Sequence, residues 1–493
     1  MITLLTTTEH QSKIVKYVKN IDRLDELVTV VLDEKEATLN SRLILVQNGC
    51  IKLNLDWYDE EPPYLFPKIK FTSDNLLGLI FYKLDNHQLA FNYITEKNPL
   101  YNDMLTATHL QFGYVISENM YAQIDSTHNQ CIVQHYGNCQ INSNTEELKE
   151  LYLKAIESSK NDEIKVFTTK HYVNLLLDKG EFKKAEKTVR RLQNRAITEE
   201  AKITLDILLA SSLMAQLEMP YQSEKLEEIL YLYHKGISFY EGKGQKVNAG
   251  LLYIEASEVA NFQSDYTASK DYINKAIFIF KEADIPEFLG EAGLRKATLL
   301  YTWSKNGSPQ YYKPAINAFQ DTLKIFKKEK HPQKFADVHH KLALIYSEIP
   351  VSPEEKPIWT AFCASSFEEV LKFYTKNSYP YEFAMARHNY ATALMGFPEA
   401  KLHNNLNKAY HMFEDALNIR KADAYPFERA LTLINQLELY WIMHNKDSEE
   451  ETKNYKTMLN KAAEVKQLVT DKNIIDQANK HLEALHNLKK ILH

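Results

Sequence analysis

A proline that returns at a near-constant interval constrains the fold of this 493-residue chain more than any other feature. Pro286, Pro332, Pro380 and Pro426 follow one another at intervals of 46, 48 and 46 residues. Proline suits the first turn of a helix, because its missing N–H would have no partner there and its fixed φ is already helical. The eleventh residue after each proline is apolar and in three cases small: Ala297, Ala343, Ala391 and Leu437. Such a period predicts a solenoid, whose units bury their apolar faces by stacking.

Each repeat has the pattern of a helical hairpin. Apolar residues after Pro332 recur at three- and four-residue steps and so share one helix face: Phe335, Ala336, Leu342, Ala343 and Tyr346. Breakers such as Gly396-Phe397-Pro398 then end the first helix, and a second helical segment leads to the next proline. The pattern predicts an all-α chain.

Composition agrees with a helical protein that lies outside membranes. The chain has only 13 Gly and 15 Pro, with 44% hydrophobic and 25% charged residues. Four scattered cysteines do not form a disulfide framework, and the first residues lack a secretory leader, so we expect a reducing cytoplasm. We find no apolar stretch long enough to span a membrane, and a net charge of -6 gives no bulk attraction to nucleic acid or anionic lipid.

The apolar pattern resembles the tetratricopeptide repeat family. Leu342, Ala343 and Tyr346 on a first helix, with Ala315 and Phe319 on a second, have that family's spacing. A shorter segment matches the family's turn glycine, aromatic, alanine and apolar positions: Gly180, Phe182, Ala185 and Val189. The resemblance covers roughly residues 70 to 445. Family units have about 34 residues, and the longer units here look like those of bacterial members. The resemblance implies a right-handed α-solenoid without a cofactor, which binds a protein or peptide in its concave groove.

The expected organisation has three parts. Residues 1–150 form a less regular, mainly helical region with a hairpin near 74–97, residues 151–447 form the solenoid with long repeats starting near 286, 332, 380 and 426, and residues 448–493 form capping helices. One alternative stays open at the N-terminus, because the β-branched run VTVVL also suits a strand and would imply a small α/β cap.

Register along the first helices names candidate partner-binding residues. If those helices line the concave surface, the groove is aromatic and bears histidines: His340, His388, Thr392, Trp441, Tyr301, Arg295, Asn389 and Asn435. The alternative is that these side chains are ordinary packing between repeats or solvated residues. A lysine or arginine and asparagine pair that binds a terminal carboxylate in some family members falls one register away here, so we predict no such clamp.

Two further clusters are weaker candidates. His128, Cys131, His135 and Cys139 have residue types that suit zinc, but their spacing lacks paired knuckles, so we expect no metal. A basic stripe could receive an acidic segment or a phosphate backbone, although a solvated helix face is the preferred interpretation: Lys183, Lys187, Arg190 and Arg191. The usual phosphate-loop, nucleophile-elbow and zinc-hydrolase motifs are absent from the sequence.

The sequence therefore predicts a non-enzymatic scaffold or adaptor that binds a protein or peptide, in bacterial regulation or complex assembly. A ligand- or peptide-responsive regulator with an effector region in residues 1–150 is the main alternative. An enzyme with its chemistry in residues 1–150 is the third. The N-terminal fold distinguishes them: continued hairpins favour the scaffold, a separate helical bundle the regulator, and a sheet with a pocket the enzyme.

Overall fold

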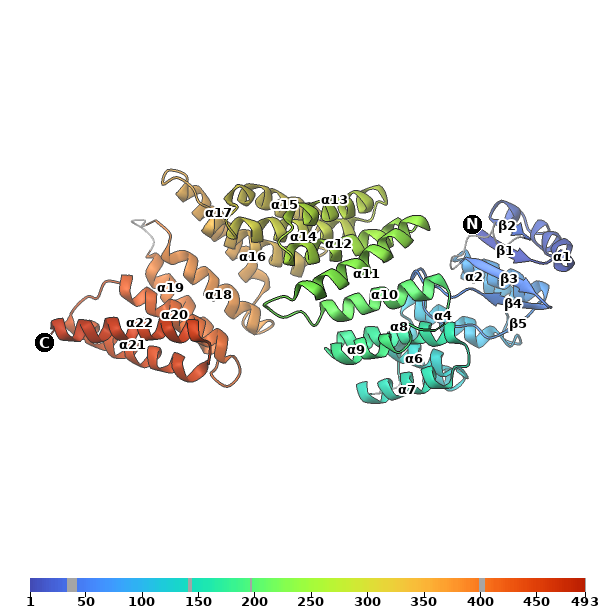
Figure 1. Ribbon diagram of the computed structural model, residues 1–493, viewed down its shortest axis with the longest axis horizontal. Helices are drawn as coiled ribbons and strands as arrows, with labels where there is room; N and C mark the ends of the chain where they lie inside the picture. Colours follow the sequence, from blue (N-terminus) through green and yellow to red (C-terminus); the bar gives the residue numbers. More distant parts are fainter. Residues whose placement is uncertain (33–41, 141–143, 196, 399–403, 493) are drawn as a thin grey trace. The chain divides into compact units, whose positions relative to one another are not determined.

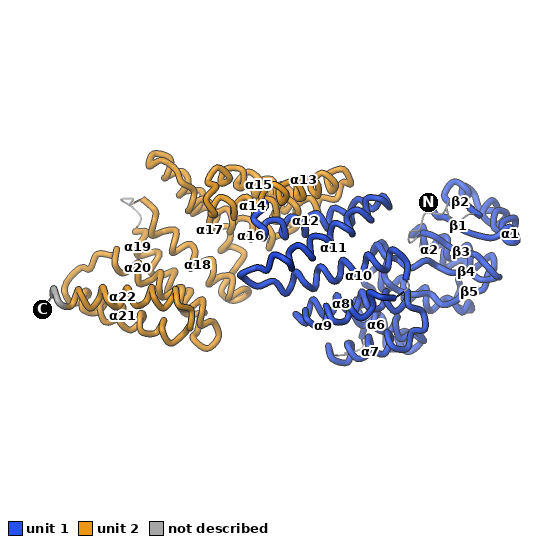
Figure 2. The backbone as a smooth tube through the Cα atoms, in the orientation of Figure 1, with its two compact units in different colours: residues 1–265 blue, residues 266–493 orange. Residues whose placement is uncertain are grey.

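The chain divides into two compact units, Met1–Asp265 and Tyr266–His493 (Figure 2). The computed structural model describes residues 1–32, 42–140, 144–195, 197–398 and 404–492. The first unit contains a β-sheet and helices α1 to α12, and the second contains α13 to α22 (Figure 1). Each helix packs on the next throughout the second unit and from α6 to α12 in the first, which confirms the helical solenoid. The boundary between the two units lies at residue 265, whereas the boundaries expected from the sequence lie at residues 150 and 447.

The chain begins with a five-stranded sheet. Its strands are β1 Ile2–Thr6, β2 Val28–Val31, β3 Leu43–Gln47, β4 Cys50–Leu53 and β5 Ile69–Lys70, in the spatial order β2-β1-β3-β4-β5. β1 pairs in parallel with β2 and β3, and α1 (Thr8–Lys19) makes the crossover from β1 to β2. Asn48 and Gly49 join β3 to β4 with φ of 51° and 68°, the left-handed pair that a tight two-residue hairpin requires.

This sheet corrects the expectation of a helical start to the chain. Helices do make up much of residues 73–136, but the described part of residues 1–70 follows the α/β alternative. The apolar run SRLILVQNGCIKLNL has helical length, yet Asn48-Gly49 divides it into two strands of five and four residues. An Asn-Gly pair between apolar runs is itself a hairpin signal. Residues 33–41 and 141–143 of the expected N-terminal region lie outside the described residues.

The two faces of the sheet have different surroundings. One face packs on α1 and on α2 (Ser73–Lys83) in a core that includes Ile44 and Val46 of β3. The other face carries a small apolar cluster: Leu5, Val31, Leu43 and Leu45. Helices therefore cover the first face in a continuous core, whereas the second face is bordered by the cavities described below.

The remaining helices of the first unit follow the sheet in chain order. They are α3 His87–Tyr93, α4 Tyr101–Phe112, α5 Glu118–Ala122, α6 Thr127–Tyr136, α7 Thr145–Ser158, α8 Asp162–Asp178, α9 Phe182–Arg190, α10 Glu199–Met214, α11 Ser223–Gly242 and α12 Lys246–Phe262. A two-stranded parallel pair, β6 Val115–Ile116 and β7 Asn138–Cys139, lies among them. From α6 onward each helix packs on the next, as hairpins in a repeat array do.

The regular elements among the described residues of the second unit are all helices. Its helices are α13 Tyr266–Glu282, α14 Pro286–Lys305, α15 Tyr312–Ile325, α16 Pro332–Glu348, α17 Lys356–Phe373, α18 Pro380–Met395, α19 Asn405–Ile419, α20 Pro426–Ile442, α21 Ser448–Leu468 and α22 Lys472–Leu492. Each periodic proline is the first residue of a helix, namely of α14, α16, α18 and α20. Each of these four packs on the helix that follows it, and α18 also contacts α16 and α20 directly.

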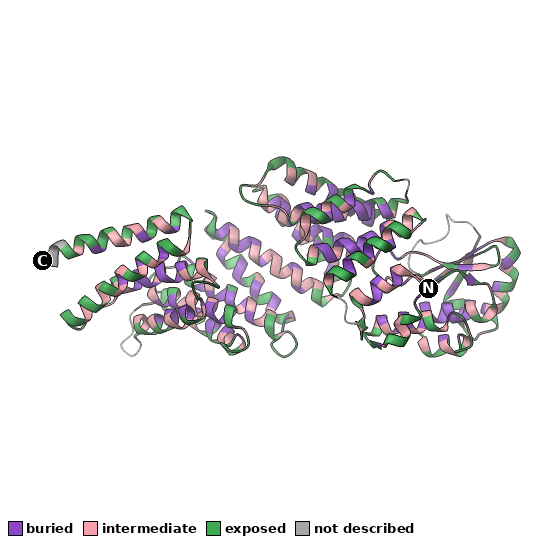
Figure 3. Ribbon diagram, turned by 90° about the horizontal axis from the view of Figure 1, so that it is seen from below, coloured by how far each residue is buried: buried purple, intermediate pink, exposed green. Residues whose placement is uncertain are grey.

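Burial explains the small residues of the repeat. The helices of this unit are buried along one side and exposed along the other (Figure 3). The eleventh residue after each periodic proline is fully buried: Ala297, Ala343, Ala391 and Leu437. A larger side chain at the alanine positions would press on neighbouring helices, because interiors are packed as densely as organic crystals. At the end of the chain α21 and α22 form a core of their own with α20.

Candidate functional site

Two histidine–asparagine pairs join the first helices of successive repeats. Nδ2 of Asn389 on α18 lies 2.9 Å from Nε2 of His340 on α16. One repeat further, Nδ2 of Asn435 on α20 donates to the Thr392 hydroxyl at 3.0 Å and approaches Nε2 of His388 at 3.4 Å. In both pairs the histidine is the eighth residue after its proline, and the asparagine is the ninth residue after the next one. We call these two pairs the His–Asn seam.

Both seam histidines are neutral at physiological pH. Burial lowers the pKa of His340 to about 4, and the neighbouring Lys341 acts in the same direction. Burial and Arg420 lower the pKa of His388 to about 3. A neutral imidazole nitrogen can accept a hydrogen bond from an amide N–H, whereas a protonated one cannot. The low pKa values therefore agree with Nε2 acting as the acceptor in each pair.

The other residues expected in the groove differ in exposure. Thr392 and Trp441 are exposed, and Trp441 Nε1 donates to His481 Nδ1 of α22 at 3.0 Å. Tyr301 is buried and donates its hydroxyl hydrogen to Glu348 at 2.7 Å, while Arg295 is half-buried. The structure thus brings four of the eight expected residues together in the seam, with Thr392 as a fifth. Contact of any of them with a partner stays a prediction.

The two histidines of residues 128–139 are engaged by other groups of the first unit. Both ring nitrogens of His128 are engaged, by the Thr168 hydroxyl at 2.8 Å and the Pro63 carbonyl at 2.9 Å. His135 binds the Tyr152 hydroxyl at 2.8 Å, and Cys131 is buried with a pKa raised to about 12. Within the described ranges, no three His, Cys, Asp or Glu side chains are grouped closely enough to hold a metal ion.

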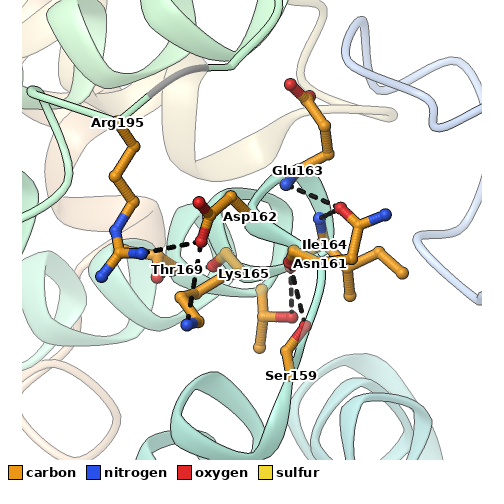
Figure 4. A network of polar contacts seen from close by, with 9 residues as sticks. Ser159, Asn161, Asp162, Glu163, Ile164, Lys165, Thr169 and Arg195 are labelled. Carbon is orange, nitrogen blue, oxygen red and sulfur yellow. Dashed lines mark hydrogen bonds and ion pairs between the residues drawn. The ribbon is translucent and has the colours of Figure 1, made fainter.

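The basic stripe on α9 is exposed and partly neutralised. Arg190 pairs with Glu186 and Glu228, and the nearby Arg195 pairs with Asp162 at the start of α8 (Figure 4). Asn161 caps that helix start by accepting from two backbone N–H groups. The other members of the stripe have no ion-pair partner among the described residues: Lys183, Lys187 and Arg191. A solvated helix face stays the preferred interpretation of the stripe.

The first unit contains a cavity of about 380 Å³ that the sequence did not predict. Its walls come from β3, β4, the segment of residues 54–68, the end of α2, and α8. Aromatic and apolar side chains make up much of the wall: Leu45, Tyr64, Phe66, Tyr82, Ile164 and Phe167. A second cavity of about 400 Å³ borders the second face of the sheet and shares six lining residues with the first: Leu45, Lys52, Leu53, Asn54, Leu55 and Ile164.

Three buried or half-buried charged groups line the first cavity. Asp56 accepts from the backbone N–H of Tyr58 at 3.1 Å and of Glu61 at 2.7 Å. Glu61 forms an ion pair with Lys83, whose side chain is only 4% exposed. Burial is the largest effect on both carboxyl groups and raises the pKa of each. Both acids are therefore already engaged by structural hydrogen bonds.

Side chains from several helices fix the cavity's segment 54–68. The Asn129 side chain binds Leu65 twice, accepting from its N–H and donating to its C=O, both at 2.8 Å. Lys170 Nζ donates to the Trp57 carbonyl at 3.3 Å. Three prolines in the segment lack N–H groups and cannot form a ladder, so side chains supply the partners. The sequence holds a faint signal of this arrangement, namely the proline-rich run DEEPPYLFP between strand and helix patterns.

The fold defines a helical-repeat protein whose first unit begins with an α/β sheet and contains a lined cavity. No protein-family model matches the chain, and no curated protein matches it. Among solved structures, the crystal structure of the yeast Tom70 is similar over 85% of this chain and 96% of that chain, with 12% sequence identity and a TM-score of 0.23. A TM-score of this size leaves the function to be argued from the chain's own residues. No helix in the described ranges has the length and apolarity that crossing a membrane requires.

Proposed function

We propose that this chain is a protein-binding adaptor, resembling tetratricopeptide repeat proteins, whose second unit binds an extended segment of a partner along α16, α18 and α20. The observation that carries the proposal is the His–Asn seam. Two asparagine amides occupy equivalent positions on neighbouring helices, and each is oriented by the histidine of the preceding repeat. An array of fixed amides at repeat spacing is suited to a ligand that is itself periodic.

The seam leaves one kind of hydrogen-bonding group for a partner. Asn435 directs its Nδ2 group to Thr392 and His388, which leaves its Oδ1 as an acceptor. Asn389 directs Nδ2 to His340 and likewise keeps its Oδ1. Both asparagines are half-buried, and Thr392 beside them is exposed. The groups presented along this face are therefore acceptors, which match the backbone N–H groups of a peptide.

Spacing selects the conformation of the peptide. Contacting helices lie about 8–10 Å apart, and α18 contacts both α16 and α20. A polyproline II segment rises about 9 Å in each turn of three residues, and its backbone N–H groups have no internal partner. One N–H in every three residues could then meet one asparagine. We infer a partner segment in this conformation with residues other than proline at those positions.

The enzyme alternative has a sheet with a cavity in its favour, which is the N-terminal arrangement that the sequence analysis associated with it. The cavity's own groups argue against catalysis. Asp56 and Glu61 are engaged by backbone N–H groups and by Lys83. The described residues that line the cavity include one thiol, that of Cys50, but no histidine that could act as its base and no serine or threonine. We therefore favour the adaptor.

Peptide selection followed by backbone methylation tests the adaptor. A displayed library of random twelve-residue peptides is selected on the full chain, and the best peptide is resynthesised with one N-methyl group at each position in turn. We expect binding to weaken about tenfold at positions three residues apart, since a lost hydrogen bond at a half-buried site costs about 1–2 kcal/mol. A scan without this period would overturn the proposed conformation.

Matched variants locate the binding face. Asn389→Ala and Asn435→Ala should each weaken the selected peptide at least fivefold. Asn377→Ala is the control, because Asn377 is an exposed asparagine of the same unit in the turn before α18. Circular dichroism verifies that the variants keep their helix content. If both seam variants bind the peptide as tightly as the control variant does, the second unit does not bind partners through this face.

A further inference from the structure

The first cavity has the dimensions and walls of a small-molecule site. Its volume of about 380 Å³ falls within the range of roughly 300–1,000 Å³ that ligand pockets occupy. Tyr64, Phe66 and Tyr82 form a chain of edge-to-face rings, with centroids 5.8 and 5.5 Å apart. Hydrogen bonds from Asn129 and His128 fix the segment that carries Tyr64 and Phe66. The wall is therefore held in place by the fold, and a flat apolar body fits against it.

The charges left for a ligand are positive. The carboxylates of Asp56 and Glu61 are engaged, by two backbone N–H groups and by Lys83 respectively. Lys52 and Lys68 also line the cavity and are exposed, and neither ammonium has an ion-pair partner within the described residues. Lys83 contributes a third ammonium, nearly fully buried, of which Glu61 engages one N–H. An acidic group on a ligand would thus meet two unpaired cations and a paired one.

We propose that this cavity binds a small organic anion with a flat apolar body and a carboxylate or phosphate group. The body lies against Tyr64, Phe66 and Tyr82, and the acidic group is bound by Lys52 and Lys68. Binding of this kind is independent of the second unit, because all the residues involved belong to residues 1–265. The chain is then an adaptor whose first unit carries a ligand site of its own.

Titration with defined probes tests the charge requirement. The full chain is titrated by calorimetry with 2-naphthoate, with adenosine monophosphate, and with the neutral 2-naphthamide, which has the naphthalene body of the first probe. We expect at least one of the two anions to bind with a dissociation constant below 1 mM, and the neutral amide to bind at least tenfold more weakly. Preference for one anion distinguishes a carboxylate from a phosphate ligand. Absence of binding by both anions, or equal binding of the amide, would overturn the proposal.

Lysine variants test the site. Lys52→Met and Lys68→Met together should weaken the anion at least tenfold. The control is the double variant Lys13→Met and Lys16→Met, which removes the same amount of charge from α1. This helix packs on the other face of the sheet. Unfolding temperatures of the unliganded variants establish that both pairs fold. If the cavity pair and the control pair weaken binding equally, long-range charge accounts for the effect and the assignment to this cavity is wrong. Peptide binding by the second unit should be unchanged in either pair.

Discussion

Lowering the pH toward 4 should destabilise the second unit, because His340 takes up a proton more readily in the unfolded chain than in the folded chain. His340 is 7% exposed and accepts a hydrogen bond from Asn389. Burial lowers its pKa from 6.5 to about 4. Below pH 6.5 the unfolded chain takes up a proton at this residue, whereas the folded chain does so only near pH 4. The stabilisation is therefore complete above pH 6.5 and is lost as the pH falls toward 4.

The two pKa values set the magnitude. The difference between 6.5 and about 4 corresponds to about 3 kcal/mol over the whole window, since one pKa unit is worth about 1.4 kcal/mol. Between pH 7 and pH 5 the linkage relation gives a loss of about 2 kcal/mol from His340 alone. A loss of this size is a large fraction of the stability of an ordinary domain, which is about 5–15 kcal/mol.

Hydrogen exchange by mass spectrometry measures this loss at the helix concerned. Opening free energies of the α16 amides are compared at pH 7 and pH 5 in the wild-type chain and in His340→Gln, which keeps an acceptor for Asn389 but does not titrate. We expect the pH-dependent loss to be about 2 kcal/mol smaller in the variant. His444→Gln, at an exposed histidine of the same unit, should behave as the wild type does. Equal pH dependence in His340→Gln and the wild type would refute the depressed pKa.

Three substitutions test packing elsewhere. Gly78→Ala should lower the unfolding temperature, because the new Cβ would lie 2.4 Å from Cγ1 of the buried Ile94, and this clash outweighs a gain in helix propensity of about 1 kcal/mol. An unchanged or higher unfolding temperature would show that α3 shifts easily to make room. Asn129→Ala should lower the free energy of unfolding in urea by about 2–4 kcal/mol, because both hydrogen bonds to Leu65 are lost together. A decrease below about 1 kcal/mol would mean that other contacts hold the segment of residues 54–68. Ala343→Leu should lower the free energy of unfolding by about 1–3 kcal/mol in the same assay, because that position is fully buried. An unchanged free energy of unfolding would indicate unfilled space beside Ala343.

The repeat could be predicted from the sequence because its signals are local. A proline at each helix start and apolar residues at three- and four-residue steps lie within one helix, and the structure begins a helix at each of those prolines. The sheet was harder to predict. Its strands have two to five residues, and β1 pairs with β3 across about forty residues of chain. Periodicity over so few residues does not separate a strand from a buried helix segment.

The cavity could not be predicted because no single segment contains it. Its walls join strands near residue 50, the proline-rich segment, α2 and α8, which lie up to about 120 residues apart. Each part has an ordinary local pattern. The engaged state of Asp56 and Glu61 depends on a backbone turn and on Lys83, which sequence spacing does not reveal. Residue types alone would have suggested a pair of free acids there.

The His–Asn seam could have been predicted from the repeat period. When units stack, residues one period apart become neighbours, so a histidine at position eight meets position nine of the next repeat. The same positions at the preceding junction are Leu294 and Lys341, which cannot form this pair. An apolar contact tolerates sliding of one helix along another, whereas a half-buried hydrogen bond is lost on sliding and leaves its polar groups unpaired. The seam therefore fixes the stacking of α16, α18 and α20 in one register, and that register keeps the two asparagine carbonyls at equivalent positions.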